Sequence, residues 1–215
     1  ADWLAVLLFV PLKNVVGARR ASWRVLNQAE GLVKDDMEQG VLKNYQKKVE
    51  KELSDLCGKV LNLLTDVLIP CCPEDNHEEK VFYLKMMGDY LRYLVRRCDC
   101  CWQAESSFLP DVFDIGILLA SGQAEVSEKD KRTTAAQRAC DAYTKAQEAS
   151  TNLAPTNPIR LGLALNFSVF YYEIMNLREK ACELAKNAFD LVRYLKPPTP
   201  CRRYIIHQLS SFFLF

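Results

Sequence analysis

Residues 45–67 read YQKKVEKELSDLCGKVLNLLTDV, and their apolar side chains recur every three or four positions. The positions that follow this step are Tyr45, Val49, Leu53, Leu56, Val60, Leu63 and Val67. Such spacing places apolar side chains on one face of an α-helix. The charged residues between positions 47 and 52 are typical of the opposite, solvated face. The stretch therefore predicts a long amphipathic helix that ends before Pro70.

The same helical period extends along most of the chain in both directions. We expect a helix over residues 3–29, with Pro11 starting or kinking its regular part because proline lacks the backbone N–H. Residues 31–40 are polar and are interpreted as a connection. Further helices are predicted at 78–97, 129–150, 159–175 and 179–195, with Asn157 as an N-cap and a turn near Asn176. Long periodic runs with short connections predict an all-α antiparallel helical array.

Composition narrows the class of protein further. With 215 residues, of which 49% are hydrophobic, the chain can bury one sizeable core. Its formal charge of +1 gives no general electrostatic basis for binding nucleic acid. The apolar start, residues 1–12, is much shorter than the roughly 20 residues of a membrane-spanning helix. Nine cysteines follow no recognisable secretory signal, so we expect reduced thiols, a cytoplasmic location, and neither a nucleic-acid nor a membrane partner.

Residues for catalysis or metal binding are scarce. The chain has two histidines, His77 and His207, and nothing that resembles a nucleophile–base triad, a phosphate-binding loop or a dinucleotide fingerprint. The cysteine clusters at 71–72 and 98–101 lack the paired C-x₂-C spacing of zinc sites. We therefore expect no enzyme, no catalytic residue, no metal and no cofactor.

Two pairs of basic residues point to an anion instead. Lys13 and Arg20 are seven positions apart, and so are Lys85 and Arg92. Seven residues are two helical turns, so each pair projects from one face of its helix. If the two helices are neighbours, the four cations converge.

The residue types in this set suit a phosphate group. A phosphomonoester carries about −1.5 to −2 charges and three acceptor oxygens. Arg20 and Arg92 offer forked donors and Tyr93 a hydroxyl, while Asp89 could orient Arg92 from three positions away. The alternative is that basic residues at helical spacing simply form a solvated face.

Residues on a later predicted helix could hold a peptide. Asn166, Val169 and Glu173 step by three and four along one face, and Leu165 with Val169 would form part of an apolar wall. An Asn amide both donates and accepts, so it can hold an extended backbone in register. With Lys85, these residues are the candidate peptide-binding set; the alternative for Asn166 is a polar residue in helix packing.

Three segments carry a family resemblance: KNVVGARRASWR at 13–24, VFYLKMMGDYLRYL at 81–94 and NPIRLGLALNFSVFYYEI at 157–174. They resemble signature runs of the 14-3-3 family, and the resemblance covers residues 7–94 and 121–195. It implies a fold of nine antiparallel helices and a cup-shaped dimer whose protomers each hold a phosphopeptide in a groove. It also implies that Lys13, Arg20, Arg92 and Tyr93 bind phosphate and that Asn166 contacts the peptide backbone.

The chain also departs from the family pattern. By position, we expect it to keep the family's third to eighth helices, without counterparts of the first two and the ninth. We expect one domain at 1–195, an irregular insertion at 98–120 and an irregular tail at 196–215. Val95, Arg96 and Arg97 stand where the family usually has Ala-Glu-Val, and Met87 stands where it often has Lys.

The function that the resemblance implies is that of an adaptor for phosphorylated signalling proteins. Its partners would be phosphoserine or phosphothreonine segments, and it would form at most a weak homo- or heterodimer with 14-3-3 proteins. Two alternatives remain open at this point. One is a helical-repeat scaffold for unphosphorylated partners, since residues 164–189 loosely resemble a tetratricopeptide unit. The other is a truncated paralogue product with little binding activity.

Overall fold

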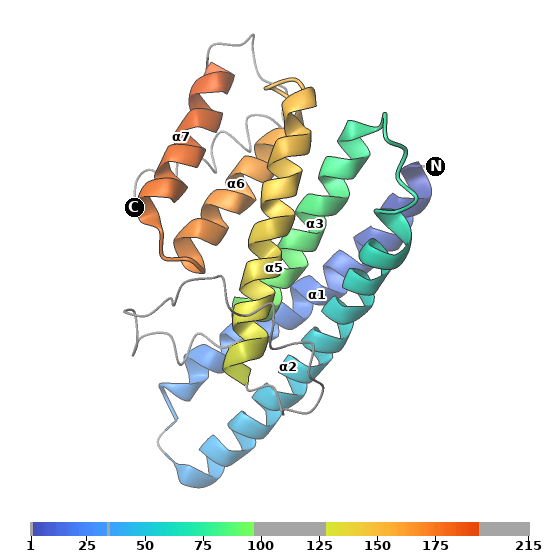
Figure 1. Cartoon of the computed structure of the whole chain (residues 1–215). Helices are drawn as coiled ribbons and strands as arrows, with labels where there is room; N and C mark the ends of the chain where they lie inside the picture. Colours follow the sequence, from blue (N-terminus) through green and yellow to red (C-terminus); the bar gives the residue numbers. More distant parts are fainter. Residues whose placement is uncertain (1, 34, 97–127, 194–215) are drawn as a thin grey trace.

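The computed structural model describes residues 2–33, 35–96 and 128–193, and every regular element in these ranges is helical (Figure 1). The α-helices are α1 (Asp2–Glu30), α2 (Asp36–Leu63), α3 (His77–Arg96), α5 (Glu128–Ala149), α6 (Pro158–Glu173) and α7 (Arg178–Arg193). A π-helical segment, Leu64–Leu68, extends α2, and a short 3₁₀ turn, Ser150–Asn152, extends α5. The all-α prediction is confirmed. The expected insertion at 98–120 and the tail at 196–215 lie outside the described residues.

Helix α3 occupies the centre of the array. It packs against α2, α5 and α6, while α1 pairs with α2 in a hairpin and α7 pairs with α6 (Figure 1). Side chains from helices that are far apart in the sequence can therefore meet around α3. This arrangement positions the candidate site.

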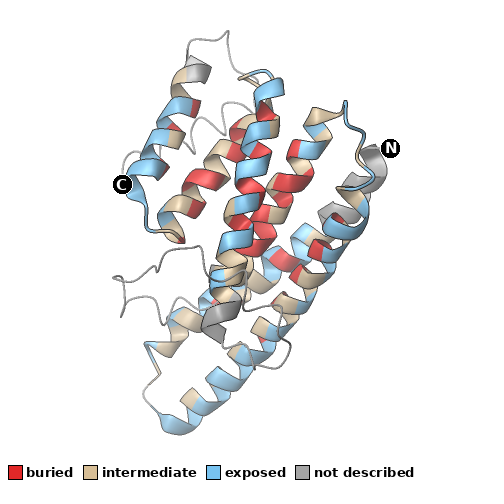
Figure 2. Ribbon diagram, viewed as in Figure 1, coloured by how far each residue is buried: buried red, intermediate tan, exposed pale blue. Residues whose placement is uncertain are grey.

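The main core lies between α3, α5 and α6, where Figure 2 shows the buried residues concentrated. Tyr143 of α5 is fully buried and stacks on Phe167 of α6, with ring centroids 5.1 Å apart. Phe170 follows one turn later, and its ring centroid is 5.4 Å from that of Tyr143. Burying side chains of this size supplies much of the hydrophobic stabilisation. The turn end of the α1–α2 hairpin is mostly exposed (Figure 2).

One boundary prediction near the amino terminus is wrong. Helix α2 begins at Asp36, so residues 36–40 are helical and do not belong to the connection. The carboxylate of Asp35 accepts a hydrogen bond from the Glu38 N–H at 3.3 Å, and acidic residues in the first turn suit the positive end of the helix dipole. Helix α1, at Asp2–Glu30, agrees with the helix expected over 3–29, and of the two alternatives given for Pro11 it excludes a helix start at that residue. A proline inside a helix lacks the backbone N–H and so removes one donor from the helix.

Predictions based on local capping chemistry are confirmed. The side chain of Asn157 accepts a hydrogen bond from the Ile159 N–H at 2.8 Å, and Pro158 is the first residue of α6. Asn176 adopts a positive φ of 52° in the turn between α6 and α7, a conformation that Asn tolerates better than most residues. None of the helices in the described ranges has the length and apolar content needed to cross a membrane.

Candidate functional site

A buried carboxylate, Asp89 of α3, organises the candidate site. Lys85 Nζ lies 2.8 Å from its Oδ2, and the Tyr143 hydroxyl donates to its Oδ1 at 2.6 Å. The amide nitrogen of Asn166 lies 2.8 Å from both carboxylate oxygens. Donors from α3, α5 and α6 therefore meet on one anion. This saturation explains how a charged side chain can be buried at the centre of the array.

The environment of Asp89 keeps it charged. Burial by itself would raise the pKa of this carboxyl, but the charges of Lys85 and Arg92 and the hydrogen bonds from Lys85 and Tyr143 outweigh it. The pKa of Asp89 is therefore lower than usual, and the group is a carboxylate at neutral pH.

Arg92 of α3 is also buried and is held from three helices. Its Nε donates to the Tyr143 hydroxyl at 3.4 Å. Its terminal nitrogens lie 3.6 Å from Asp89 Oδ1 and 3.6 Å from Glu173 Oε2 of α6. Burial opposes the charge of Arg92, but contact with Tyr143 and Asp89 more than offsets it and raises the pKa of the guanidinium. The side chain is therefore an ordered cation in a defined position.

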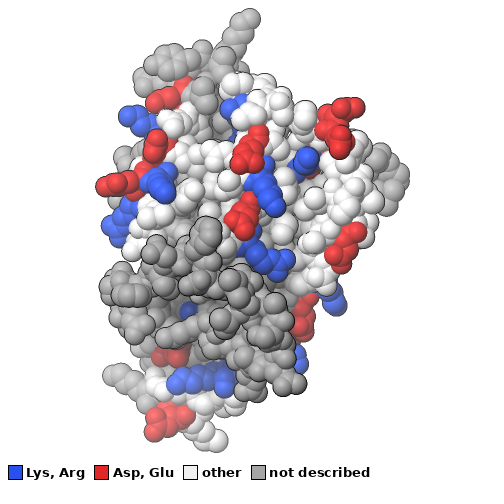
Figure 3. Space-filling view, in the orientation of Figure 1, with Lys and Arg blue, Asp and Glu red and all other residues white. Residues whose placement is uncertain are grey.

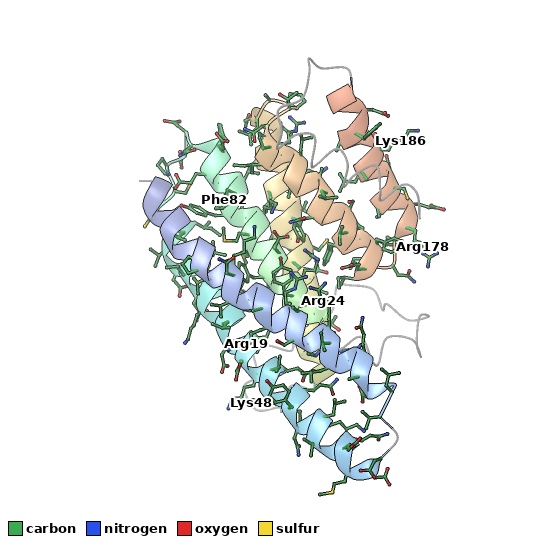
Figure 4. All side chains as sticks on the ribbon, turned by 180° about the vertical axis from the view of Figure 1, so that it is seen from behind. Arg19, Arg24, Lys48, Phe82, Arg178 and Lys186 are labelled. Carbon is green, nitrogen blue, oxygen red and sulfur yellow. The ribbon has the colours of Figure 1, made fainter. Side chains whose placement is uncertain are left out.

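Helix α1 brings a second arginine to this place. The guanidinium carbon of Arg20 lies 3.8 Å from the ring centroid of Tyr93, and that of Arg92 lies 5.2 Å from the same centroid. Both distances fall within the range of cation–π attraction. The structure thus brings together Arg20, Arg92 and Tyr93, from two helices whose proximity the sequence left open. Figure 4, from the side opposite to Figure 1, shows α1 crossing in front of α3.

The remaining predicted residues stand around this centre. Lys13 is exposed on α1 two turns before Arg20, and its side chain makes no ion pair or hydrogen bond with the described residues. Leu165 and Val169 are half-buried on α6, with Leu165 beside a small apolar cluster that α6 forms with α7. Lys85, Asn166 and Glu173 join the network of Asp89 and Arg92 directly. The structure therefore links the two predicted sets, on α3 and α6, through one carboxylate.

Two residues of the site, Tyr143 and Gly88, were missed in the sequence. Tyr143 lies in an Ala-rich helix, and nothing in its spacing connects it with α3. A Cβ at Gly88 would lie 2.7 Å from Cε1 of the Tyr143 ring. A glycine in the middle of a helix costs about 1 kcal/mol relative to alanine and can mark a close approach. A glycine at position 88, inside a predicted helix, was thus the feature of the sequence that could have indicated a bulky side chain packed against α3.

One face of the molecule carries charges of both signs. On the face seen in Figure 3, the described basic and acidic side chains are interspersed over the helices. Binding of an anion would therefore depend on local groups such as Arg20 and Arg92 and not on a general field.

Known proteins match most of this chain in sequence. The family model described as 14-3-3 protein matches residues 4–104 and 123–194. The chain is 48% identical over 185 residues to 14-3-3 protein homolog 1 of Schistosoma mansoni, an alignment that covers 86% of this chain and 61% of the relative. It is 46% identical over 186 residues to 14-3-3-like protein 2 of Caenorhabditis elegans, with 86% of this chain and 62% of the relative covered.

The chain thus spans less than two thirds of the length of these relatives. Residues 105–122, which the family model leaves unmatched, overlap the stretch interpreted as an insertion. The matched residues include all three segments that carried the resemblance, and they include Lys13, Arg20, Arg92, Tyr93 and Asn166. The chain belongs to the 14-3-3 family.

Proposed function

We propose that this protein is an adaptor that binds phosphoserine or phosphothreonine segments of other proteins, without catalysis. The observation that carries the proposal is the convergence of Arg20 and Arg92 on the ring of Tyr93. Two guanidinium groups from different helices can donate to different oxygens of one phosphate, and charge-assisted bonds of this kind are stronger than neutral ones. The Tyr93 hydroxyl adds a third donor of the right kind.

The balance of charge supports an anionic ligand. Four cations of the predicted site, Lys13, Arg20, Lys85 and Arg92, stand against two carboxylates, Asp89 and Glu173. A phosphomonoester carries about −1.5 to −2 charges at neutral pH, so a place where several cations meet suits it. Lys85 and Arg92 are already ordered by Asp89, so binding requires little rearrangement on α3.

The peptide on either side of the phosphate would lie along α6. The amide nitrogen of Asn166 is committed to Asp89, which fixes the direction of the amide group. Its carbonyl oxygen makes no hydrogen bond with the described residues, so it can accept one from a peptide N–H. Leu165 and Val169, half-buried on the same helix, would contact apolar peptide side chains.

The wider role follows from the same proposal. The partners would be phosphorylated signalling proteins of the cytoplasm, and the protein would form at most a weak homo- or heterodimer with 14-3-3 proteins. The apolar side chains with the largest exposed fractions cluster in sequence around the α1–α2 turn: Val25, Leu32, Met37, Val41 and Tyr45. Association through this end would bury apolar surface that is otherwise in water.

Two neighbouring arginines provide a matched test of the phosphate site. Arg20 lies over Tyr93, whereas Arg19 points to α2 and pairs with Glu52 at 2.7 Å. Arg20→Ala and Arg19→Ala remove the same charge from adjacent positions. We expect Arg20→Ala to lower affinity for a phosphoserine peptide by about tenfold or more, because a charge-assisted hydrogen bond is lost. Arg19→Ala should leave that affinity within about twofold of wild type.

Fluorescence anisotropy with a phosphoserine peptide and its unphosphorylated twin measures both effects. If the two variants weaken phosphopeptide binding equally, the interaction is a general attraction between charges and the proposed site is wrong. If neither variant changes the binding of the phosphopeptide, Arg20 does not contact the phosphate.

A further inference from the structure

The ring of Tyr143 is fixed in place by its surroundings. It is fully buried, stacks on Phe167 and packs beside Phe170. On its remaining side it lies so close to α3 that three ring atoms would stand 2.7–2.8 Å from a Cβ at Gly88. That distance is shorter than the usual contact of a Cβ with a ring carbon, so glycine is what allows the approach. Because the ring cannot move, the hydroxyl of Tyr143 has a fixed position beside α3.

At that point the hydroxyl bridges the two charged residues of α3. It donates to Asp89 Oδ1 at 2.6 Å and accepts from Arg92 Nε at 3.4 Å. Burial and the neighbouring carboxylate raise the pKa of Tyr143 well above its ordinary value, so the group remains a hydroxyl that can both donate and accept. Arg92 is thus held by Nε on the α5 side, with its terminal nitrogens directed to Asp89 and Glu173.

We infer that Tyr143 is a positioning residue for phosphate binding: its hydroxyl fixes the guanidinium of Arg92 beside Tyr93 without touching the ligand. The inference rests on the proposed function. Without the hydroxyl, Nε loses its acceptor, and the guanidinium is held only by the two contacts at 3.6 Å to Asp89 and Glu173. It can then adopt other orientations, in which its donors do not face a phosphate. Binding of a phosphate would then have to order Arg92, and this ordering would weaken the affinity.

The substitution that isolates the hydroxyl is Tyr143→Phe, since it keeps the aromatic ring and its stacking. Tyr171→Phe is its matched control. Tyr171 stacks on the same Phe167, with centroids 4.5 Å apart, and its hydroxyl makes no hydrogen bond with Asp89 or Arg92. We expect Tyr143→Phe to reduce affinity for a phosphoserine peptide by about 3- to 10-fold, less than the loss of a direct contact, because the hydroxyl acts through Arg92. Binding of the unphosphorylated twin should not change, and Tyr171→Phe should behave as wild type.

A second readout separates positioning from a general structural role. The hydrogen bond from Tyr143 is one of the interactions that lower the pKa of Asp89. In Tyr143→Phe, the carboxyl carbon of Asp89, followed by nuclear magnetic resonance during a pH titration, should therefore titrate at higher pH than in wild type. Loosened packing alone, with the site unaffected, would leave this midpoint unchanged.

The outcomes of the experiment are distinct. A wild-type protein that does not prefer the phosphorylated peptide would overturn the proposed function and this inference together. A wild-type preference that Tyr143→Phe retains in full, in a variant that melts as a folded protein, would overturn this inference alone. A reduced preference with a raised titration midpoint for Asp89 is the expected result.

Discussion

The close contact between Gly88 and Tyr143 leads to a quantitative prediction about stability. Gly88→Ala places a methyl group 2.7–2.8 Å from three atoms of a ring that is confined by Phe167 and Phe170. Because the ring is fully buried and cannot move away freely, α3 and α5 must separate slightly or the ring must leave its rotamer. Overpacking of this kind costs about 1–3 kcal/mol.

Alanine also favours the helical state, so the clash must be separated from helix propensity. Gly58, inside α2, is the matched control because a Cβ there meets nothing within 4 Å. Gly58→Ala should raise the free energy of unfolding by about 1 kcal/mol through propensity alone. Gly88→Ala should gain the same stability from helix propensity but lose about 1–3 kcal/mol through the clash with Tyr143. The free energies of unfolding of the two variants should therefore differ by about 1–3 kcal/mol.

Urea unfolding followed by circular dichroism gives both free energies. We expect Gly58→Ala to be the more stable variant and Gly88→Ala to be less stable than it by the free-energy cost of the clash. If both substitutions stabilise the protein equally, Tyr143 does not press against α3, and the geometry on which the positioning of Arg92 depends is wrong.

Two further outcomes are expected. Because the pKa of Asp89 is lower in the folded protein than its usual value, its contribution to stability is present above about pH 4 and is lost as the pH falls through the folded-state pKa. Urea unfolding between neutral and acid pH should therefore show a steeper loss of stability for wild type than for Asp89→Asn; parallel curves would show that Asp89 is not held as a carboxylate. Val41 is 65% exposed on α2, so Val41→Asp should weaken any self-association seen by sedimentation velocity without lowering stability. Association that Val41→Asp leaves unchanged would place the contact elsewhere.

The sequence predicted those parts of the fold that depend on local chemistry. Helical periodicity located the helices, and the Asn157-Pro158 pair marked the first turn of α6 because capping is decided within a few residues. The error at 36–40 has an equally local cause. These residues were interpreted as a connection because their polarity masked an N-terminal helical turn capped by Asp35.

The candidate site was only partly predictable, for a geometric reason. The seven-residue spacing placed Arg20 and Arg92 on defined faces, but whether those faces meet depends on how α1 crosses α3. Tyr143 could not be found in this way, because it reaches Asp89 and Arg92 from 54 and 51 positions along the chain. A single sequence does not encode such a contact as a periodic signal, and only the glycine at position 88 indicated it.

Calorimetric titration of the wild-type protein with a phosphoserine peptide and with its unphosphorylated twin, each at low and at moderate salt, tests the central claim most directly. Since Arg20 and Arg92 converge on Tyr93, the phosphorylated peptide should bind at least about tenfold more tightly, the equivalent of one charge-assisted hydrogen bond. The ratio of the two affinities should fall as the salt concentration rises, because salt screens the exposed part of the electrostatic interaction. Superimposable titrations of the two peptides, with a sample that circular dichroism shows to be folded, would contradict the claim that this site recognises phosphate.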